Sequence, residues 1–188
     1  MKPEEKARVK IDQWLTEAGW KVINRDEFEA DSSAVAVREG LLKGNREADY
    51  FLFINGKAVG ILEAKREEID ANKGVVCDQV EAYARGVPSF YTAYQKPIPF
   101  LYTSNGKQHY FHDFRKKDSD YEEIFAMHKP KKLVEMLGIE DPFAGLPTLN
   151  PKGLRACQYE AINGLEKSFR NGQNRALMVL ATGAGKTY

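Results

Sequence analysis

The sequence contains little of what marks several classes of protein. Only two of its 188 residues are cysteine, Cys77 and Cys157, and they lie too far apart to suggest a disulfide framework or a zinc-binding spacing. The longest uninterrupted apolar run, residues 176–181, is far too short to span a bilayer. The N-terminus is polar and shows no secretory signal pattern, so we expect a cytoplasmic protein.

An excess of charge of one sign is also missing. The net charge of +1 provides no global basic surface for nucleic acid, so any DNA contact must come from local clusters. Such clusters are Lys43 with Arg46, Lys65 with Arg66, and residues 115–117, although charge runs of this kind are most often solvated surface. The 43% apolar and 29% charged fractions are those of a soluble globular chain.

Hydrophobic periodicity and turn residues predict an α/β chain. Helices are expected over residues 4–18, 73–85, 130–137 and 154–170. Strands are expected over residues 21–24, 35–37, 50–54, 58–64, 98–104, 107–112 and 176–181. Asn55-Gly56 and Asn105-Gly106 each indicate a hairpin turn. The Pro- and Gly-rich residues 141–153 predict a linker between a domain at 1–140 and a shorter piece at 154–188.

Two acids and a lysine stand at the ends of two apolar runs. Asp49 precedes the run 50–54, and Glu63 and Lys65 close the run that begins at residue 58. Phosphodiester hydrolysis uses a metal to neutralise phosphate charge and acidify a water, and converging carboxylates suit Mg²⁺, which prefers oxygen ligands. Lys65 follows Glu63 by two residues on a strand, so both point to one face, where an ammonium can orient the water or stabilise developing negative charge.

Asp49 and Glu63 can share a metal only if the hairpin between them is irregular. A plain two-residue Asn55-Gly56 turn pairs Ala48 with Glu63 and puts Asp49 on the opposite face of the sheet. A three-residue loop or a β-bulge instead brings Asp49 level with Glu63 on one face. The nuclease interpretation therefore predicts an odd loop or a bulge between residues 49 and 63.

The same three residues could instead be charges on the solvated face of an ordinary sheet, because the bare spacing often arises by chance. Two features favour a functional site. The strands are otherwise apolar, where an unpaired carboxylate is unfavourable. On the following helix, Gln79 and Tyr83 share a face at i and i+4 and can hydrogen-bond to Lys65 or to a DNA backbone, an amphipathic helix edge being the alternative.

With these residues the chain resembles the PD-(D/E)xK nuclease fold, a mixed central sheet flanked by helices, in the form found at the N-terminus of type I restriction enzyme R (motor) subunits. The phrase Gly60-Ile-Leu-Glu-Ala-Lys65 is similar to that family, and the resemblance covers essentially the whole chain. It implies that Asp49 and Glu63 are Mg²⁺ ligands, that Lys65 is catalytic, and that Gln79 and Tyr83 form a supporting motif.

One departure from the family pattern is Ala48, which stands where the family has the proline that names the motif. The residue at this position contacts no metal in the family, so the departure leaves the metal ligands unchanged. An acidic residue of the first helix, Glu4 or Glu5, is a weaker candidate near the site. The resemblance further implies double-stranded DNA as substrate, and modification and specificity subunits as partners.

The end of the chain carries a second motif, a glycine-rich phosphate-cradling loop after an apolar run. It resembles the loop of superfamily 2 helicases and translocases, although Leu180 stands at the first glycine position. Upstream, Gln158 resembles the adenine-contacting residue of their Q motif. The loop residues that this resemblance assigns to ATP are Thr182, Gly183, Gly185, Lys186 and Thr187.

The sequence ends one residue after this loop, before the helix that would aim its positive end at the phosphates. We therefore expect ATP binding in a longer parent protein and no ATP hydrolysis by this chain. We also expect the last ~35 residues to pack poorly, because an isolated strand and helix cannot build a core.

The leading hypothesis is a Mg²⁺-dependent endonuclease domain of a type I restriction R subunit, to which ATP-driven translocation delivers DNA. Type III restriction subunits carry their nuclease after the motor, so the order here favours type I. One alternative is a non-cleaving module that binds DNA or docks the motor onto partner subunits. Another is the nuclease domain of a different nuclease–helicase fusion.

Overall fold

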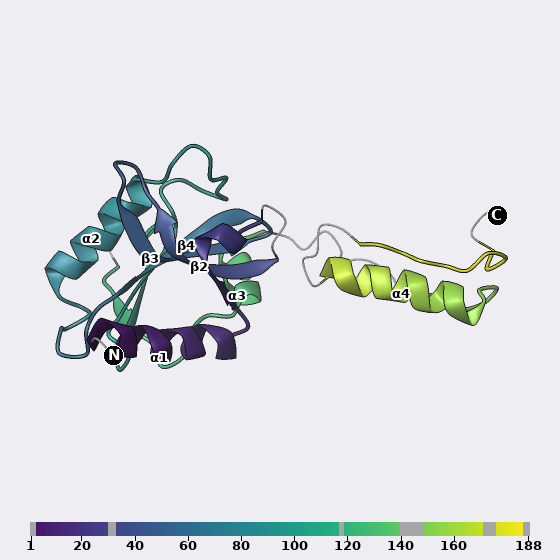
Figure 1. Ribbon diagram of the computed structural model, residues 1–188, viewed down its shortest axis with the longest axis horizontal. Coiled ribbons are helices and arrows are strands. Elements are labelled where there is room, and N and C mark those ends of the chain that lie inside the picture. Colours follow the sequence, from purple (N-terminus) through teal and green to yellow (C-terminus); the bar gives the residue numbers. More distant parts are fainter. Residues whose placement is uncertain (1–2, 30–32, 117–118, 140–148, 171–175, 186–188) are drawn as a thin grey trace.

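The structure is a computed structural model that describes residues 3–29, 33–116, 119–139, 149–170 and 176–185. The helices are α1 (Pro3–Glu17), the 3-10 helix η1 (Arg25–Glu27), α2 (Gly74–Arg85), α3 (Pro130–Met136) and α4 (Ala156–Arg170). The strands are β1 (Lys21–Ile23), β2 (Ala34–Leu41), β3 (Glu47–Ile54), β4 (Lys57–Ala64), β5 (Phe100–Ser104), β6 (His109–Asp113) and β7 (Glu122–Glu123). Each predicted helix is present (Figure 1).

The strands form one seven-stranded mixed sheet in chain order, which confirms the predicted α/β class. β1 pairs with β2, and β4 with β5, in parallel, while the other neighbours are antiparallel. A parallel pair needs a crossover connection, and α2 supplies it between β4 and β5. The short strand β7 and the helix η1 were not expected from the sequence.

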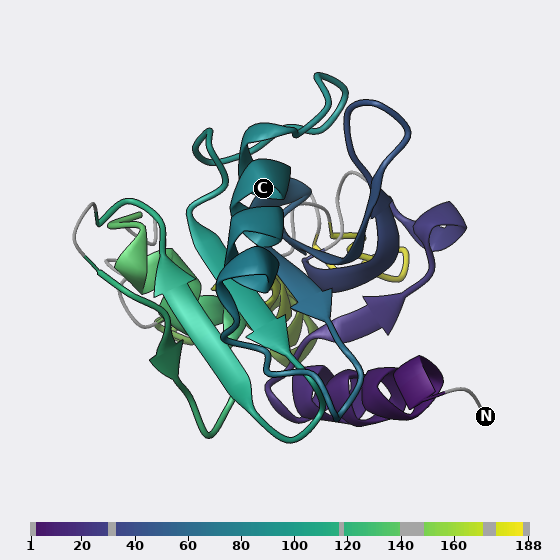
Figure 2. The ribbon, with the colours of Figure 1, turned by 90° about the vertical axis from the view of Figure 1, so that its left-hand side faces the viewer.

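Helices cover both faces of the sheet, with α1 on one side and α2 on the other (Figure 1 and Figure 2). Successive side chains of β3 alternate between the two faces. Phe51 and Phe53 pack in the cluster that includes Val80 of α2, whereas Leu52 packs in the cluster that includes Ile11 of α1. All five of these side chains are fully buried, so β3 is the centre of the core. Asp49 lies on this strand, and Glu63 lies on its neighbour β4.

The last part of the chain differs from the expectation in one element. Residues 176–181, predicted as a buried strand, form no strand, and Leu177 and Val179 are 89% and 81% exposed. A strand needs a hydrogen-bonded neighbour, and the described residues provide none for this segment. Among those residues, neither core cluster includes any after Leu137, which agrees with the expected poor packing of the C-terminal segment.

Within the described segments, no helix is both long enough and apolar enough to cross a membrane. The predicted linker at 141–153 lies largely outside the described residues. The predicted division into a domain at 1–140 and a piece at 154–188 therefore stays a prediction.

Candidate active site

The β3–β4 hairpin contains the bulge that a shared site requires. Its turn is Asn55-Gly56, where both residues have positive φ angles, 50° and 68°. The register runs regularly from the turn to Phe53↔Ala58 and then shifts, so that Leu52 pairs with Gly60 and Tyr50 with Leu62. Val59 is the extra residue, and the continued register brings Asp49 level with Glu63. The predicted bulge is confirmed.

A loop on the far side of β4 accounts for the position of this bulge. The N–H of Ala58 donates to the carbonyl of Thr92 at 2.8 Å, and the N–H of Tyr94 donates to the carbonyl of Ala58 at 3.3 Å. Ala58 thus pairs with residue 93 in a parallel bridge, just before β4 begins its pairing with β5. The loop therefore holds the strand where the extra residue is inserted.

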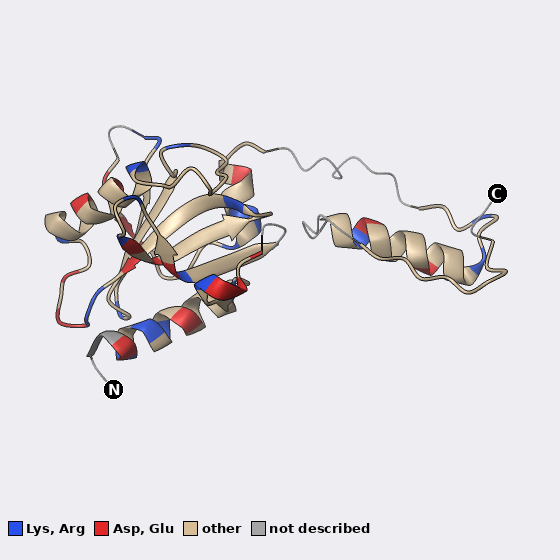
Figure 3. Ribbon diagram, turned by 45° about the horizontal axis from the view of Figure 1, so that its top comes forward, with Lys and Arg blue, Asp and Glu red and all other residues tan. Residues whose placement is uncertain are grey.

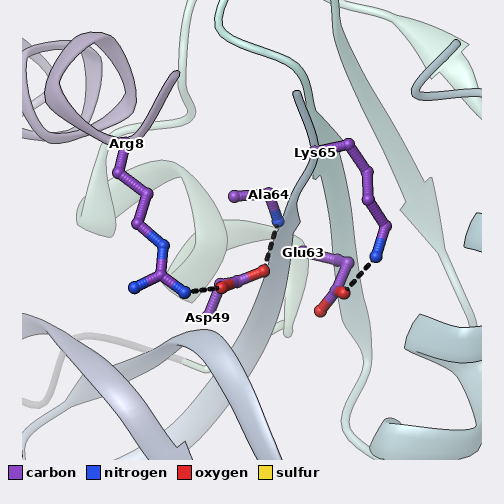
Figure 4. Close-up of a pocket in the computed structure, with 5 residues that line it drawn as sticks. All are labelled: Arg8, Asp49, Glu63, Ala64 and Lys65. Atoms are coloured by element: carbon purple, nitrogen blue, oxygen red, sulfur yellow. Dashed lines mark hydrogen bonds and ion pairs between the residues drawn. The ribbon is translucent and has the colours of Figure 1, made fainter. Parts of the chain in front are cut away.

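The ladder between β3 and β4 ends at Tyr50 and Leu62, and a pocket opens directly beyond it (Figure 4). The next N–H of β4 that points toward β3 is that of Ala64, and it donates to Oδ2 of Asp49 at 2.8 Å instead of to a backbone carbonyl. The carboxylate of Asp49 is thereby fixed between the two strands. The pocket has a volume of about 200 Å³ and is lined by Arg8, Asp49, Glu63, Ala64 and Lys65.

Glu63 is the most buried acid of this pocket, with 4% of the residue exposed. Its pKa is raised to about 7, mainly by burial and then by the negative charge of Asp49, while the Lys65 ammonium opposes both effects. The Nζ of Lys65 donates to Oε1 of Glu63 at 2.6 Å. Two carboxylates that converge in a buried place are thus held together against their mutual repulsion by a neighbouring cation.

Besides its bond to Glu63 of β4, Lys65 makes hydrogen bonds with two further elements. Its backbone N–H donates to the carbonyl of Ser104 on β5 at 2.7 Å, and its Nζ donates to Oε1 of Gln79 on α2 at 3.0 Å. The Nε2 of Gln79 in turn donates to the hydroxyl of Tyr83 at 2.6 Å. The structure thus brings together all five residues that the sequence singled out for catalysis, in the order Asp49, Glu63, Lys65, Gln79 and Tyr83.

Arg8 is a pocket residue that the sequence reasoning missed. Its guanidinium forms an ion pair with Asp49 (Figure 4). It also reaches Oε1 of Glu39 at 3.1 Å. The sequence offers one weak signal, since Arg8 borders the apolar stripe of α1 that packs on the sheet. Of the two acids suggested for this helix, Glu5 is exposed and does not line the pocket, and the side chain of Glu4 lies outside the described residues.

The pocket residues fit a Mg²⁺ ion. Asp49 and Glu63 offer carboxylate oxygens, and Mg²⁺ commonly binds through one or two carboxylates while keeping several waters. Among the described residues no group of three or more acidic, histidine or cysteine side chains forms a protein-only cage. The register partner of Glu63 on β5, Thr103, has a buried hydroxyl without a hydrogen-bond partner, a polar group suited to a hydrated ion.

The phosphate-loop residues are only partly described. Gly183 and Gly185 have φ angles of 81° and 77°, which glycine adopts readily. The Nε2 of Gln158 donates to the carbonyls of Ala184 and Gly185 at 3.0 and 2.9 Å, so the structure brings Gln158 onto the loop. Thr182 lies in the same exposed turn, and Lys186 and Thr187 lie outside the described residues. ATP binding stays a prediction.

Known proteins similar to this chain are restriction enzyme subunits. Residues 35–120 match the family model described as type I restriction enzyme R protein N terminus, and residues 151–188 match that described as type III restriction enzyme, res subunit. The EcoKI endonuclease subunit of a type I restriction enzyme from Escherichia coli (strain K12) is 28% identical, over 98% of this chain and 20% of its own length. The EcoAI endonuclease subunit of Escherichia coli is also 28% identical, over 93% of this chain and 22% of its own length.

The chain therefore spans about a fifth of the length of these curated relatives. A solved fragment described as an HsdR subunit of a type I restriction enzyme from Vibrio vulnificus YJ016 is 22% identical, with a TM-score of 0.45. That alignment covers 100% of this chain and 36% of the solved chain.

Proposed function

We propose that the Asp49 pocket is a Mg²⁺-dependent DNA endonuclease site, in a chain whose residues 35–120 match the family model of the type I restriction enzyme R protein N terminus. The observation that carries the proposal is the bulge at Val59. It places Asp49 and Glu63 side by side in an otherwise apolar sheet, with Lys65 on the same face. Without that extra residue, the three side chains could not converge.

Asp49 and Glu63 would hold the ion, which neutralises phosphate charge and acidifies a bound water. The chain contributes the position of these oxygens: Asp49 is fixed by the Ala64 N–H, and Glu63 by burial beside Lys65. Lys65 presents a donor at the pocket, where it orients the attacking water or stabilises negative charge on the phosphate. The Nζ of Lys65 already donates hydrogen bonds to Glu63 and Gln79, so the position of the ammonium is set before substrate arrives.

Gln79 and Tyr83 act through Lys65 and are positioning residues. The hydroxyl of Tyr83 accepts from Nε2 of Gln79, which leaves the Gln79 carbonyl oxygen turned toward the ammonium. The amide of Gln79 could not serve Lys65 as an acceptor if it were flipped. The Lys65 ammonium, which can only donate, therefore fixes the orientation of the amide, and the Tyr83 hydroxyl accepts the remaining amide N–H.

The basic cluster of Lys43 and Arg46 supports an approach of DNA along the C-terminal end of α2. The N–H of Lys43 donates to the carbonyl of Gly86, and the guanidinium of Arg46 lies 5.7 Å from the ring centroid of Tyr83. By contrast, Arg115 donates to both carboxylate oxygens of Asp113, at 2.8 and 2.7 Å, and is a structural cation. Figure 3 shows acidic and basic residues intermixed along α1, so this helix provides no uniformly basic surface.

In the parent protein, we propose, an ATP-driven translocase that follows this domain delivers double-stranded DNA to the site. Modification and specificity subunits of a type I restriction complex would be its partners, with the whole assembly in the cytoplasm. The match of residues 151–188 to a restriction enzyme res subunit supports a motor that begins at the end of this chain.

The test is cleavage of supercoiled plasmid by the parent subunit assembled with its partner subunits, in the presence of Mg²⁺ and ATP. Asp49→Ala and Lys65→Ala should each lower the cleavage rate at least ~100-fold while ATP hydrolysis continues. Lys107→Ala is the matched control, because Lys107 pairs with Glu67 outside the pocket, and it should retain the wild-type rate. Unchanged cleavage by both site variants would disprove the proposal, and a complex that binds DNA but never cuts it would favour a non-cleaving docking module.

A further inference from the structure

We propose that Arg8 is a displaceable counter-ion of the metal site. Without a divalent cation, its guanidinium holds the carboxylate of Asp49, and it withdraws from that carboxylate when the cation binds. The inference rests on the proposed function, because it assigns a role to a residue that faces the same pocket. It adds the first helix of the chain to the machinery of the site.

Three acids form a row across three neighbouring strands. Glu39 falls between the register pairs Arg38↔Tyr50 and Gly40↔Ala48, so it lies level with Asp49. Asp49 in turn lies level with Glu63 on β4. Like charges on adjacent strands repel each other, and this row needs positive charge when no metal is present.

The chain supplies two cations, one at each end of the row. Lys65 donates to Glu63 at 2.6 Å, and Arg8 bridges the carboxylates of Asp49 and Glu39. Oδ1 of Asp49 accepts from Arg8, and Oδ2 accepts from the Ala64 N–H. A divalent cation on Asp49 would lie beside the guanidinium, and two positive charges at that distance repel each other.

Of the two contacts of the Asp49 carboxylate described above, Arg8 is the one that can leave. The Ala64 N–H belongs to the backbone of β4 and cannot move independently, whereas the side chain of Arg8 is long and 37% exposed. Glu39, whose side chain is 56% exposed, remains as a partner for the guanidinium. Release of Asp49 therefore leaves Arg8 paired and costs little.

Mn²⁺ binding to the 188-residue chain tests this inference, with free Mn²⁺ followed by its electron paramagnetic resonance signal. Arg8→Gln removes the competing charge and should lower the Mn²⁺ dissociation constant about tenfold, which corresponds to about 1.4 kcal/mol. Arg8→Lys keeps a charge that cannot bridge two carboxylates and should give an intermediate constant. Lys10→Gln is the matched control, because Lys10 lies on the same helix but pairs with Glu67 outside the pocket, and its constant should stay within about twofold of wild type.

Thermal unfolding provides a second readout. In EDTA, Arg8→Gln should have a lower melting temperature than wild type, because Asp49 and Glu63 lose a neutralising cation. Saturating Mn²⁺ should raise the melting temperature of this variant more than that of wild type. The inference is overturned if Arg8→Gln binds Mn²⁺ no more tightly than wild type. If Asp49→Asn abolishes Mn²⁺ binding in that case, the proposed function stands. If wild type and all variants bind no Mn²⁺, both proposals fail.

Discussion

At the scale of single residues, Glu63 makes the site a source of instability. Its pKa is raised to about 7 by burial and by the charge of Asp49, so the folded chain favours its protonated form. The stabilisation that protonation gives is complete below the ordinary glutamate pKa of about 4.5 and is lost as pH rises through 7. The protein thus carries a buried charge at neutral pH that a cation could relieve.

Glu63→Gln should therefore stabilise the metal-free chain at pH 8, by up to roughly 3 kcal/mol, and abolish cleavage. The gain should shrink to less than about 1 kcal/mol at pH 5, where Glu63 of the folded wild type is protonated and only the unfolded chain still ionises at this residue. Urea unfolding in EDTA at both pH values measures this difference in the free energy of unfolding. Glu135→Gln changes an exposed carboxylate and should shift stability by less than about 0.5 kcal/mol at either pH. A variant that is less stable than wild type at pH 8 would contradict the effect assigned to Glu63.

At the scale of elements, the irregular strand β4 sets the register of the site. Gly60 follows the bulge residue and lies between Leu52 of β3 and Phe100 of β5. A Cβ atom on Gly60 would stand 3.0 Å from the Leu52 side chain and 3.0 Å from the carbonyl oxygen of Phe100. The carbonyl belongs to the backbone of a central strand, so the strands would have to separate.

Gly60→Ala should destabilise the chain by about 1–3 kcal/mol and reduce cleavage, because the spacing of β3, β4 and β5 positions Asp49 and Glu63. Gly74→Ala is the matched control at the first residue of α2, where a Cβ would meet nothing within 4 Å. It should leave cleavage unchanged and raise stability by up to about 1 kcal/mol, since alanine favours the helix. Chemical denaturation distinguishes the two, and equal stability of both variants would contradict the tight packing at Gly60.

Elements also show how far the sequence alone could lead. Asn55-Gly56 carries a strong turn signal, and the need for Asp49 and Glu63 to meet on one face of the sheet predicts the bulge between them. The bulge residue itself could not be predicted, because it is fixed by the loop at residues 92–94, far along the chain. Arg8 was missed for the same reason: its contact with Asp49 depends on how α1 packs on the sheet.

At the scale of the whole molecule, the two core clusters are complete without the C-terminal segment. The described residues that form them all precede residue 138, while Leu177 and Val179 of the C-terminal segment are largely exposed. The strand predicted at 176–181 had the right composition but lacked a neighbouring strand among the described residues. We propose that residues 1–140 form the nuclease domain and that residues 154–188 gain their packing from a motor domain in the parent protein.

The most direct test of the central claim is anomalous X-ray diffraction from crystals of this chain soaked in Mn²⁺. The account predicts a peak between the carboxylates of Asp49 and Glu63, with the Arg8 guanidinium moved away from Asp49. Asp49→Asn crystals under the same conditions should lack that peak. Wild-type crystals at saturating Mn²⁺ that show no ion between these two carboxylates would contradict the assignment of a metal-dependent nuclease site.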